Sequence, residues 1–239
     1  ESREAELLHD EQRLKQAMET KERELDIMRR VDLTVVISEN ERKLLRKYLP
    51  DAPMGVFPGL YAPIVEEPAP FAIRKDIFFL GGFAHRPNVD AALWFSQEIW
   101  PLIHARLPEA SFHIIGSEAP GKIKALGSIP GVVVDGFVKD LDPLLNSIRL
   151  GVAPLRFGAG IKGKVAMTFG SGVPCICTEI AAEGMGLKDG VHTFIANEPQ
   201  AFADAVVKAY TDETVWTRMS VESREQVRRL FSEEANRHR

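Results

Sequence analysis

Glycines and basic residues crowd the segment RFGAGIKGK, residues 156–164, in a spacing that suits phosphate binding. Its chemistry-bearing positions are three glycines and three cations, namely Gly158, Gly160, Gly163, Arg156, Lys162 and Lys164. Glycines let backbone amides approach a ligand closely, because no side chain stands in the way. A helix is expected to begin at about Ile161, and the free N–H groups at a helix start favour an anion. Together these residues predict a diphosphate site.

Two known phosphate-binding patterns overlap on this loop, and neither fits it fully. The three glycines spell G-x-G-x-x-G, and Glu179 follows at about the distance of a ribose-binding acid. That fingerprint belongs after the first strand of a domain, whereas several predicted strands precede this loop. The first and third glycines with Lys164 also begin a P-loop, but Val165 stands where Ser or Thr must bind magnesium. What remains is a phosphate site without a metal requirement, or a tight loop that only packs a helix on a sheet.

Strand-like and helix-like segments alternate along most of the chain, which is typical of a parallel sheet covered by helices. Strands are expected at residues 31–38, 54–58, 76–82, 111–116, 131–136, 149–155, 174–179 and 192–197. Helices are expected at residues 1–30, 39–49, 88–107, 141–148, from about 161, 198–212 and 213–231. The predicted fold class is α/β, a Rossmann-like, doubly wound parallel sheet.

Three details of these elements follow from local chemistry. The run at 31–38 is continuously apolar, as in a strand buried on both faces. Ser38 and Glu41 have the spacing of a capping box, which would open the next helix. Pro101 is expected to kink or end the helix at 88–107, because it lacks the backbone N–H.

Four prolines between residues 58 and 70 divide the chain into two parts. Residues 1–60, including the long charged helix, are expected to be the C-terminal remnant of one α/β domain. Residues 61–75 are expected to be a linker, since closely spaced prolines forbid regular structure. Residues 76–239 then form a second domain, which contains the glycine-rich loop.

The composition limits the binding partners and the cellular compartment expected for this protein. The 239 residues carry 30 Lys and Arg against 34 Asp and Glu, a net charge of −4, which argues against a general nucleic-acid binder. No apolar run approaches the ~18 residues of a membrane helix, and no signal peptide opens the sequence. Cys175 and Cys177 alternate on one predicted strand, so we expect buried thiols without a disulfide. A cytoplasmic location is expected, with peripheral association at the inner membrane left open.

Several other residues that could do chemistry are expected to be structural. His104 and His113 fall on predicted core elements, and His192 opens a predicted strand and is expected to face solvent. Trp94, Trp100 and Trp216 lie on helix stripes and are expected to serve packing. The apolar stripe of residues 1–30 is expected to pack on the rest of the chain or to form a homodimer.

The glycine-rich loop and the segments around it resemble a known family. "APLRFGAGIKGKV", followed by "GSGVPCICT" and "AAEGMGL", resembles the C-terminal half of a family 4, or group 1, glycosyltransferase. "RRVDLTVVISENERKLL" resembles the last β-α unit of that family's N-terminal domain. "FFLGGFAHRPNVDAALWF" resembles the first strand and helix of its donor domain, and "FADAVVKAYTDETVWTRMSVESREQV" its closing helices. The resemblance covers roughly residues 28–232.

This resemblance implies a GT-B enzyme, in which two Rossmann-like domains face each other across a cleft. Residues 76–239 would bind a nucleotide-sugar donor as substrate, with no further cofactor and no metal, and residues 1–60 would end the acceptor domain. The full-length protein would transfer the sugar, with retention of configuration, to a glycan or lipid-linked acceptor. The chain alone is expected to be inactive. The alternative is a non-catalytic nucleotide-binding or scaffold module derived from a GT-B half.

The resemblance also assigns residues, although it assigns no catalytic group. The family's second diphosphate cation matches Lys162 or Lys164, of which Lys164 fits better. Its paired acids would fall at Ala159 and Met167, neither of which is acidic. The family's Gly-Arg pair falls on Gly81 and Gly82, so His85 or Arg86 would have to reach the diphosphate in place of the missing arginine. Glu183 is the nearest remaining acid. The expected donor-pocket residues are therefore Gly81, Gly82, His85, Arg86, Glu183 and Gly184.

Overall fold

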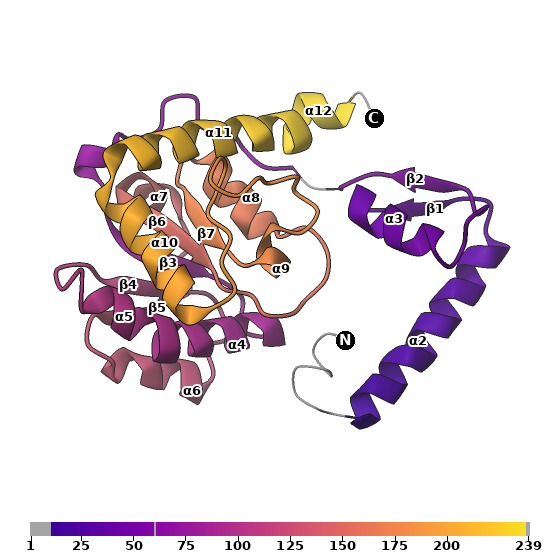
Figure 1. The fold of residues 1–239 in the computed structure, drawn as a ribbon, viewed down its shortest axis with the longest axis horizontal. Coiled ribbons are helices and arrows are strands. Elements are labelled where there is room, and N and C mark those ends of the chain that lie inside the picture. The colour runs from indigo at the N-terminus through magenta and orange to yellow at the C-terminus, as the bar shows by residue number, and fades with distance from the viewer. Residues whose placement is uncertain (1–10, 60, 238–239) are drawn as a thin grey trace.

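The computed structural model describes residues 11–59 and 61–237, which form two parallel sheets with helices packed on them (Figure 1). The first sheet pairs β1 (Thr34–Val36) with β2 (Met54–Val56) in parallel. Along the chain, α2 (Glu11–Arg30) precedes β1 and α3 (Glu39–Arg46) connects β1 to β2. Leu25 of α2 is buried against Leu49 and Met54, so α2 packs on this first unit.

The second sheet has five parallel strands, as the doubly wound fold requires. They are β3 (Lys75–Leu80), β4 (Phe112–Ile115), β5 (Val132–Gly136), β6 (Ile148–Ala153) and β7 (Cys175–Cys177). Their spatial order is β5-β4-β3-β6-β7, so the chain first builds outward from β3 and then crosses back to β6. The strand order therefore reverses between β3 and β6, which is the switch point where such sheets bind ligands. The predicted fold class is confirmed.

Helices cover both faces of this sheet (Figure 1). Along the chain they are α4 (Arg86–Trp94), α5 (Trp100–His104), α6 (Gly121–Lys124), α7 (Asp142–Ser147), α8 (Gly163–Gly170), α9 (Glu179–Ala182), α10 (Pro199–Thr211), α11 (Glu213–Phe231) and α12 (Glu233–Arg237). Alternate residues of β3 face opposite ways, as the period of a strand demands. Ile77 and Phe79 join the main hydrophobic core, while Phe78 belongs to a second, smaller core beside α7.

Most local expectations hold. Glu41 N donates to Ser38 Oγ over 3.1 Å, which confirms the N-terminal cap of α3. The helix predicted at 88–107 is interrupted by a π-helical segment, Phe95–Ile99, directly before α5. Pro101 explains the position of this segment, because a proline lacks the N–H that an unbroken helix needs there. Both cysteines are free and buried, as expected. The three tryptophans are also buried in the core.

Three of the sequence predictions, on two strands and on one histidine, are wrong. The run at 31–38 is not a strand buried on both faces: Val35 is 57% exposed, since in the described residues β1 pairs with β2 alone. Residues 192–197 form no strand but isolated bridges, because the side chain of Asp189 accepts the N–H of Ile195 over 2.8 Å. His192 does not face solvent; it is 8% exposed, and its Nδ1 accepts from Lys188 N. Burial lowers the pKa of His192.

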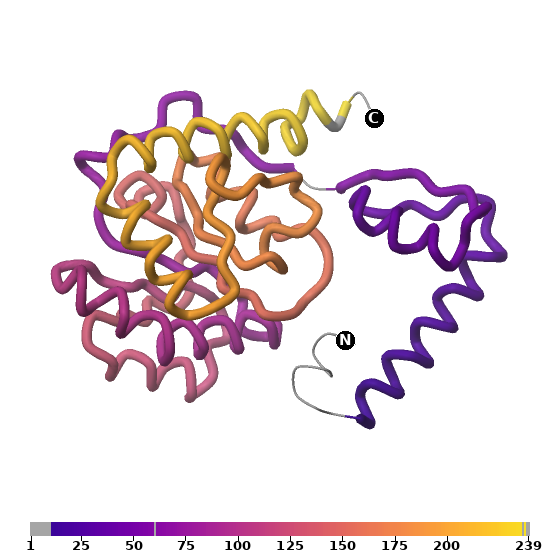
Figure 2. Tube along the Cα trace, in the orientation of Figure 1, coloured from indigo at the N-terminus to yellow at the C-terminus, as the bar shows by residue number. Residues whose placement is uncertain are grey.

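The proline-rich segment after residue 60 is bound tightly to the second unit. Figure 2 shows its trace running along α11 toward β3. Arg224 donates to two carbonyls of the segment, those of Val65 and Glu66. Val65 N in turn donates to Gly170 O over 2.9 Å, at the end of α8. One 3₁₀ turn, Phe71–Ile73, is the regular structure it contains among its described residues.

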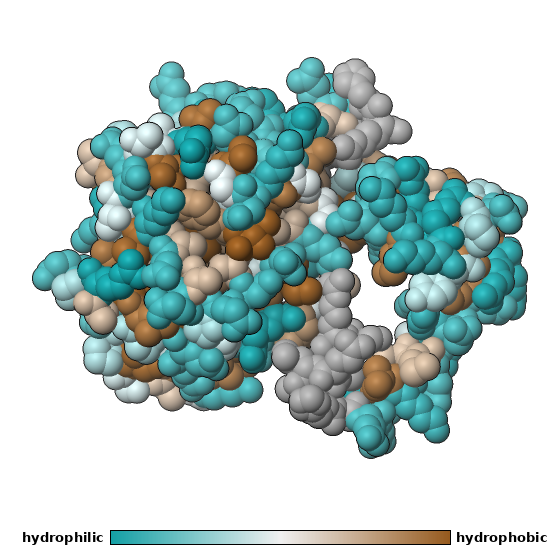
Figure 3. Space-filling view, viewed as in Figure 1, coloured by the Kyte–Doolittle hydropathy of each residue, from teal (hydrophilic) through white to brown (hydrophobic). Residues whose placement is uncertain are grey.

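The surface of residues 11–59 is mainly hydrophilic, with separate hydrophobic spots (Figure 3). Met18 is 60% exposed on α2, whereas Leu25 of the same helix is buried. The predicted stripe is thus partly covered by the chain itself. Its first residue, Leu7, lies outside the described residues, and a homodimer through residues 1–30 stays a prediction. None of the described helices is long and apolar enough to cross a membrane.

We expect Gly170→Ala to destabilise the protein, because α8 and the proline-rich segment meet there backbone to backbone. A Cβ at Gly170 would lie 2.3 Å from Pro63 O. Overpacking of this kind costs about 1–3 kcal/mol of unfolding free energy. Urea unfolding measures it, with Gly121→Ala as control, since a Cβ there meets no atom within 4 Å. Equal stability of the two variants would contradict the prediction.

Candidate functional site

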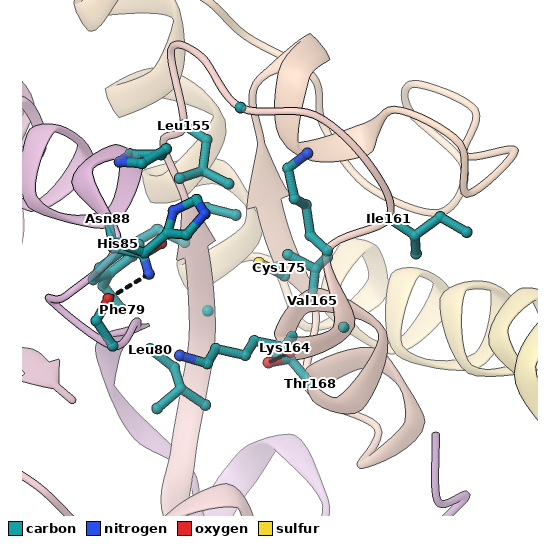
Figure 4. A pocket seen from close by; sticks show the side chains of 18 of the residues that line it. Phe79, Leu80, His85, Asn88, Leu155, Ile161, Lys164, Val165, Thr168 and Cys175 are labelled. Atoms are coloured by element: carbon teal, nitrogen blue, oxygen red, sulfur yellow. Dashed lines mark hydrogen bonds between the residues drawn. The ribbon is translucent and has the colours of Figure 1, made fainter. Parts of the chain in front are cut away.

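A cavity of about 430 Å³ opens at the carboxyl ends of β3 and β6, at the switch point of the sheet. Its walls come from four places: the ends of these strands, the turn at 82–88, the loop at 155–163 and the first turns of α8. Figure 4 shows their side chains converging on one space. The glycine-rich loop predicted to bind phosphate thus lies where doubly wound sheets bind ligands.

The loop's glycines are needed for its shape. Gly158 and Gly160 have φ angles of 116° and 78°, a left-handed region that other residues rarely adopt. α8 then begins at Gly163, two residues later than expected, with Lys162 as its N-cap. No side chain caps this helix, and its first residues line the cavity. The start of α8 therefore offers free N–H groups to a ligand.

Lys164 places its ammonium group inside this arrangement. A Cβ added at Gly82 would lie 3.8 Å from Lys164 Nζ, so the lysine reaches across to the end of β3. Figure 4 shows the side chain extended toward Leu80. Among the described residues no group accepts a hydrogen bond from this ammonium or forms an ion pair with it. Burial lowers the pKa of Lys164, because water solvates the charge incompletely.

The turn at 82–88 forms the opposite wall. Asn88 Nδ2 donates to Gly82 O over 2.8 Å and so fixes the turn. His85 is the N-cap residue of α4 without capping it, and its ring lies in the cavity (Figure 4). The sequence analysis does not single out Asn88, because its side chain bonds a carbonyl six residues earlier in the chain.

Arg156 lies away from the cavity lining and pairs with another helix. Its guanidinium donates to both carboxylate oxygens of Asp90 on α4, at 2.9 and 2.5 Å. It also lies over the ring of Trp94, 5.4 Å from the centroid. The hydrogen bonds with Asp90 raise the pKa of Arg156. Its predicted contact with a diphosphate stays a prediction, as does that of Arg86, which is not among the lining residues either.

The remaining predicted residues surround neighbouring spaces. Glu183 borders a second cavity of about 700 Å³, which lies between the glycine-rich loop and the helices α2 and α3. Gly184 lies beside the first unit, where a Cβ would come 3.2 Å from Ser38 Cβ. Gly81 has no room for a side chain, because a Cβ would come 2.8 Å from Asn88. Gly158 and Ala159 border both cavities and so join them.

The cavity at the switch point is basic and free of acids. Lys162, Lys164 and His85 line it, and no Asp or Glu does so among the described residues. Ala159 is exposed at its rim, and Met167 packs into the second hydrophobic core instead of the cavity. In the part of the chain that the structure describes, no three metal-ligating side chains lie together. The geometry suits an anion with two or more charges.

A five-stranded doubly wound sheet with a basic cavity at its switch point defines a Rossmann-like α/β fold class. Within that class, residues 74–212 match the family described as "Glycosyl transferases group 1", and the chain belongs to this family. The resemblance read from the sequence is therefore confirmed. A curated relative, an uncharacterised 44.6 kDa protein in the cps region of Klebsiella pneumoniae, is 24% identical over 140 residues. The match covers 55% of this chain and 36% of that protein.

Solved structures show the same fold. S. aureus TarM, as a point mutant in complex with fondaparinux, alpha-GlcNAc-glycerol and UDP, matches with a TM-score of 0.75 and 13% identity over 92% of this chain and 45% of its own. The pneumococcal O-GlcNAc transferase GtfA in complex with UDP and GlcNAc matches with a TM-score of 0.69 and 17% identity, over 87% of this chain and 44% of its own. Sucrose-phosphate synthase from Thermosynechococcus elongatus matches with a TM-score of 0.70 and 17% identity, over 89% of this chain and 57% of its own. At these identities the likeness establishes the GT-B fold alone. The chain spans about half the length of these structures.

We expect Lys164 to titrate below the usual pKa of a lysine side chain, because burial of its ammonium group disfavours the charged form. An anion binds the protonated lysine, so affinity should fall as the pH rises through this lowered pKa. NMR titration of ¹³C-labelled lysine side chains measures the pKa, with Lys164→Arg to assign the signal. Bound diphosphate should shift the titration upward. A Lys164 signal that titrates at or above the usual pKa of a lysine would contradict the prediction.

Proposed function

We propose that the chain is the donor-binding half of a glycosyltransferase that transfers a sugar from a nucleotide-sugar donor to an acceptor. The observation that supports it best is Lys164, a cation without a partner among the described residues, in an acid-free cavity at the switch point. Two of the solved relatives are complexes with UDP and a sugar ligand. The family and the cps-region relative favour a role in polysaccharide biosynthesis.

In the proposed reaction an acceptor hydroxyl oxygen forms a bond to the sugar C1, and the bond between C1 and the diphosphate oxygen breaks. The diphosphate leaves with the electron pair of the broken bond, and the proton of the acceptor hydroxyl passes to the departing diphosphate or to solvent. The leaving group therefore gains negative charge in the transition state. Lys164 and the N–H groups at the start of α8 would face this charge, and fixed donors of this kind stabilise it without reorganisation. The transfer is proposed to need no metal, since these donors provide the neutralisation. Retention of configuration is proposed from the family resemblance alone.

The acceptor is proposed to enter through the second cavity. Gly158 and Ala159 border both this cavity and the one at the switch point, and Glu183 borders the second cavity. Lys21 and Lys43 line it from α2 and α3. A glycan or lipid-linked acceptor placed there would meet the donor sugar at the glycine-rich loop. Holding both reactants in one geometry is worth several orders of magnitude in rate.

A second candidate function is nucleotide binding without catalysis. It is favoured by Ala159 and Met167, the positions where the family resemblance implies acids. Met167 lies in a hydrophobic core, which offers no hydrogen-bond acceptor to a donor sugar. The two functions share the diphosphate site and differ in turnover.

Direct titration of UDP, GDP and ADP tests the proposed site, with Lys164→Ala as the variant. Losing a charge-assisted contact of about 1.5–3 kcal/mol should weaken binding roughly ten- to a hundredfold. Lys124→Ala is the matched control, because Lys124 is exposed on α6 and outside the cavity. EDTA should leave the affinity unchanged. If Lys164→Ala binds as the parent does, or chelation abolishes binding, this site is not the metal-free diphosphate site.

Residues 1–239 alone are expected to bind the diphosphate without robust sugar transfer. The solved relatives are about twice as long as this chain, and transfer depends on both walls of the cleft. Incubation with a radiolabelled nucleotide sugar and candidate acceptors measures turnover. Efficient acceptor-dependent transfer by this chain would refute the prediction, and its absence in a full-length parent would favour the non-catalytic alternative.

A further inference from the structure

The cavity at the switch point, which we call the donor cavity, has polar groups suited to the diphosphate of a nucleotide but few suited to its ribose. A diphosphate needs donors and positive charge, and the cavity provides them through Lys162, Lys164, His85 and the start of α8. Lys162 Nζ also donates to Gly160 O over 2.6 Å, so part of its donor capacity holds the loop. Lys164 is the cation whose ammonium group has no protein acceptor among the described residues.

Ribose hydroxyl groups need acceptors, and here the cavity offers little. A carboxylate suits a vicinal diol best, since its two oxygens can accept from both hydroxyls. None of the described lining residues is Asp or Glu. The one lining side-chain hydroxyl in the described chain, that of Thr168, donates to Lys164 O over 2.8 Å. The amide N–H of Asn88 likewise serves the turn at Gly82.

The acids nearest along the chain do not fill this gap. Glu179, at the distance of a ribose-binding acid, is exposed on α9 and outside the cavity lining. Glu183 borders the second cavity, beyond the glycine-rich loop. Met167, one turn of α8 beyond Lys164, packs in the core with Phe78.

We propose that this cavity recognises its nucleotide through the diphosphate and is indifferent to the ribose hydroxyls. It would accept ribo-, deoxyribo- and dideoxyribonucleoside diphosphates with similar affinity. The inference rests on the proposed function, because it specifies how the donor cavity selects its ligand. The physical reason is that a site discriminates strongly for a hydroxyl only when it has buried groups left unpaired by its loss.

Isothermal titration at fixed ionic strength tests the inference with three ligands. They are the tightest binder among UDP, GDP and ADP, its 2′,3′-dideoxy analogue and its monophosphate. We expect the dideoxy analogue to bind within about threefold of the parent diphosphate, whereas a hydroxyl-reading site can discriminate by about 10⁴-fold. The monophosphate should bind at least about tenfold more weakly, as a lost charge-assisted contact implies.

Variants separate this inference from the proposed function. Lys164→Ala should weaken the diphosphate and its dideoxy analogue by the same factor, while Lys124→Ala should change neither. A dideoxy analogue more than about tenfold weaker would overturn the inference and leave the donor site standing. A monophosphate as tight as the diphosphate would overturn the inference and also contradict the proposed diphosphate site. If none of the three nucleoside diphosphates binds, the proposed function fails and the inference fails with it.

Discussion

The parallel pairing of β3 with β6 is the constraint on which the site depends. Phe78 lies opposite Gly151 in this pairing, at the centre of the sheet. A Cβ at Gly151 would come 3.1 Å from both Phe78 and Thr168, so the glycine lets α8 and the sheet approach closely. That approach brings the start of α8 to the end of β3, and Lys164 to Gly82. Without it the loop and the turn at 82–88 would not share one cavity.

Three cations show how differently this fold treats positive charge. Arg74 is 1% exposed and donates to the carbonyls of Ala69, Leu145 and Ile148, although burial lowers its pKa to about 10. Arg156 has the carboxylate of Asp90. Lys164 has neither carbonyls nor an acid in the described chain, and its lowered pKa records that cost. A bound anion would remove the cost, which is why this cation argues for a ligand and the two arginines for structure.

The sequence predicted the sheet well because each strand carries its own signal of buried apolar residues. It also predicted a helix after the glycine-rich loop, because glycines and lysines in one short window are a local signal. It could not predict which hydrogen-bond partners individual side chains have. Asp90 binds Arg156 across 66 residues of sequence, and Asp189 takes the N–H that a strand at 192–197 would need. His192 is buried by a turn with Lys188, which no periodicity announces. The proposed domain limits and site roles stay predictions.

The position of Met167 bears on the choice between catalysis and binding alone. One turn of helix separates it from Lys164, yet the two side chains leave α8 toward different surroundings, a hydrophobic core and a cavity. A carboxylate in that core would lose its hydration, which proteins tolerate only with a partner. An acid at position 167 would therefore need a polar partner in that core, whereas the cation at position 164 lines the cavity. This contrast favours diphosphate binding through Lys164 as the part of the proposed function that needs no acid on α8.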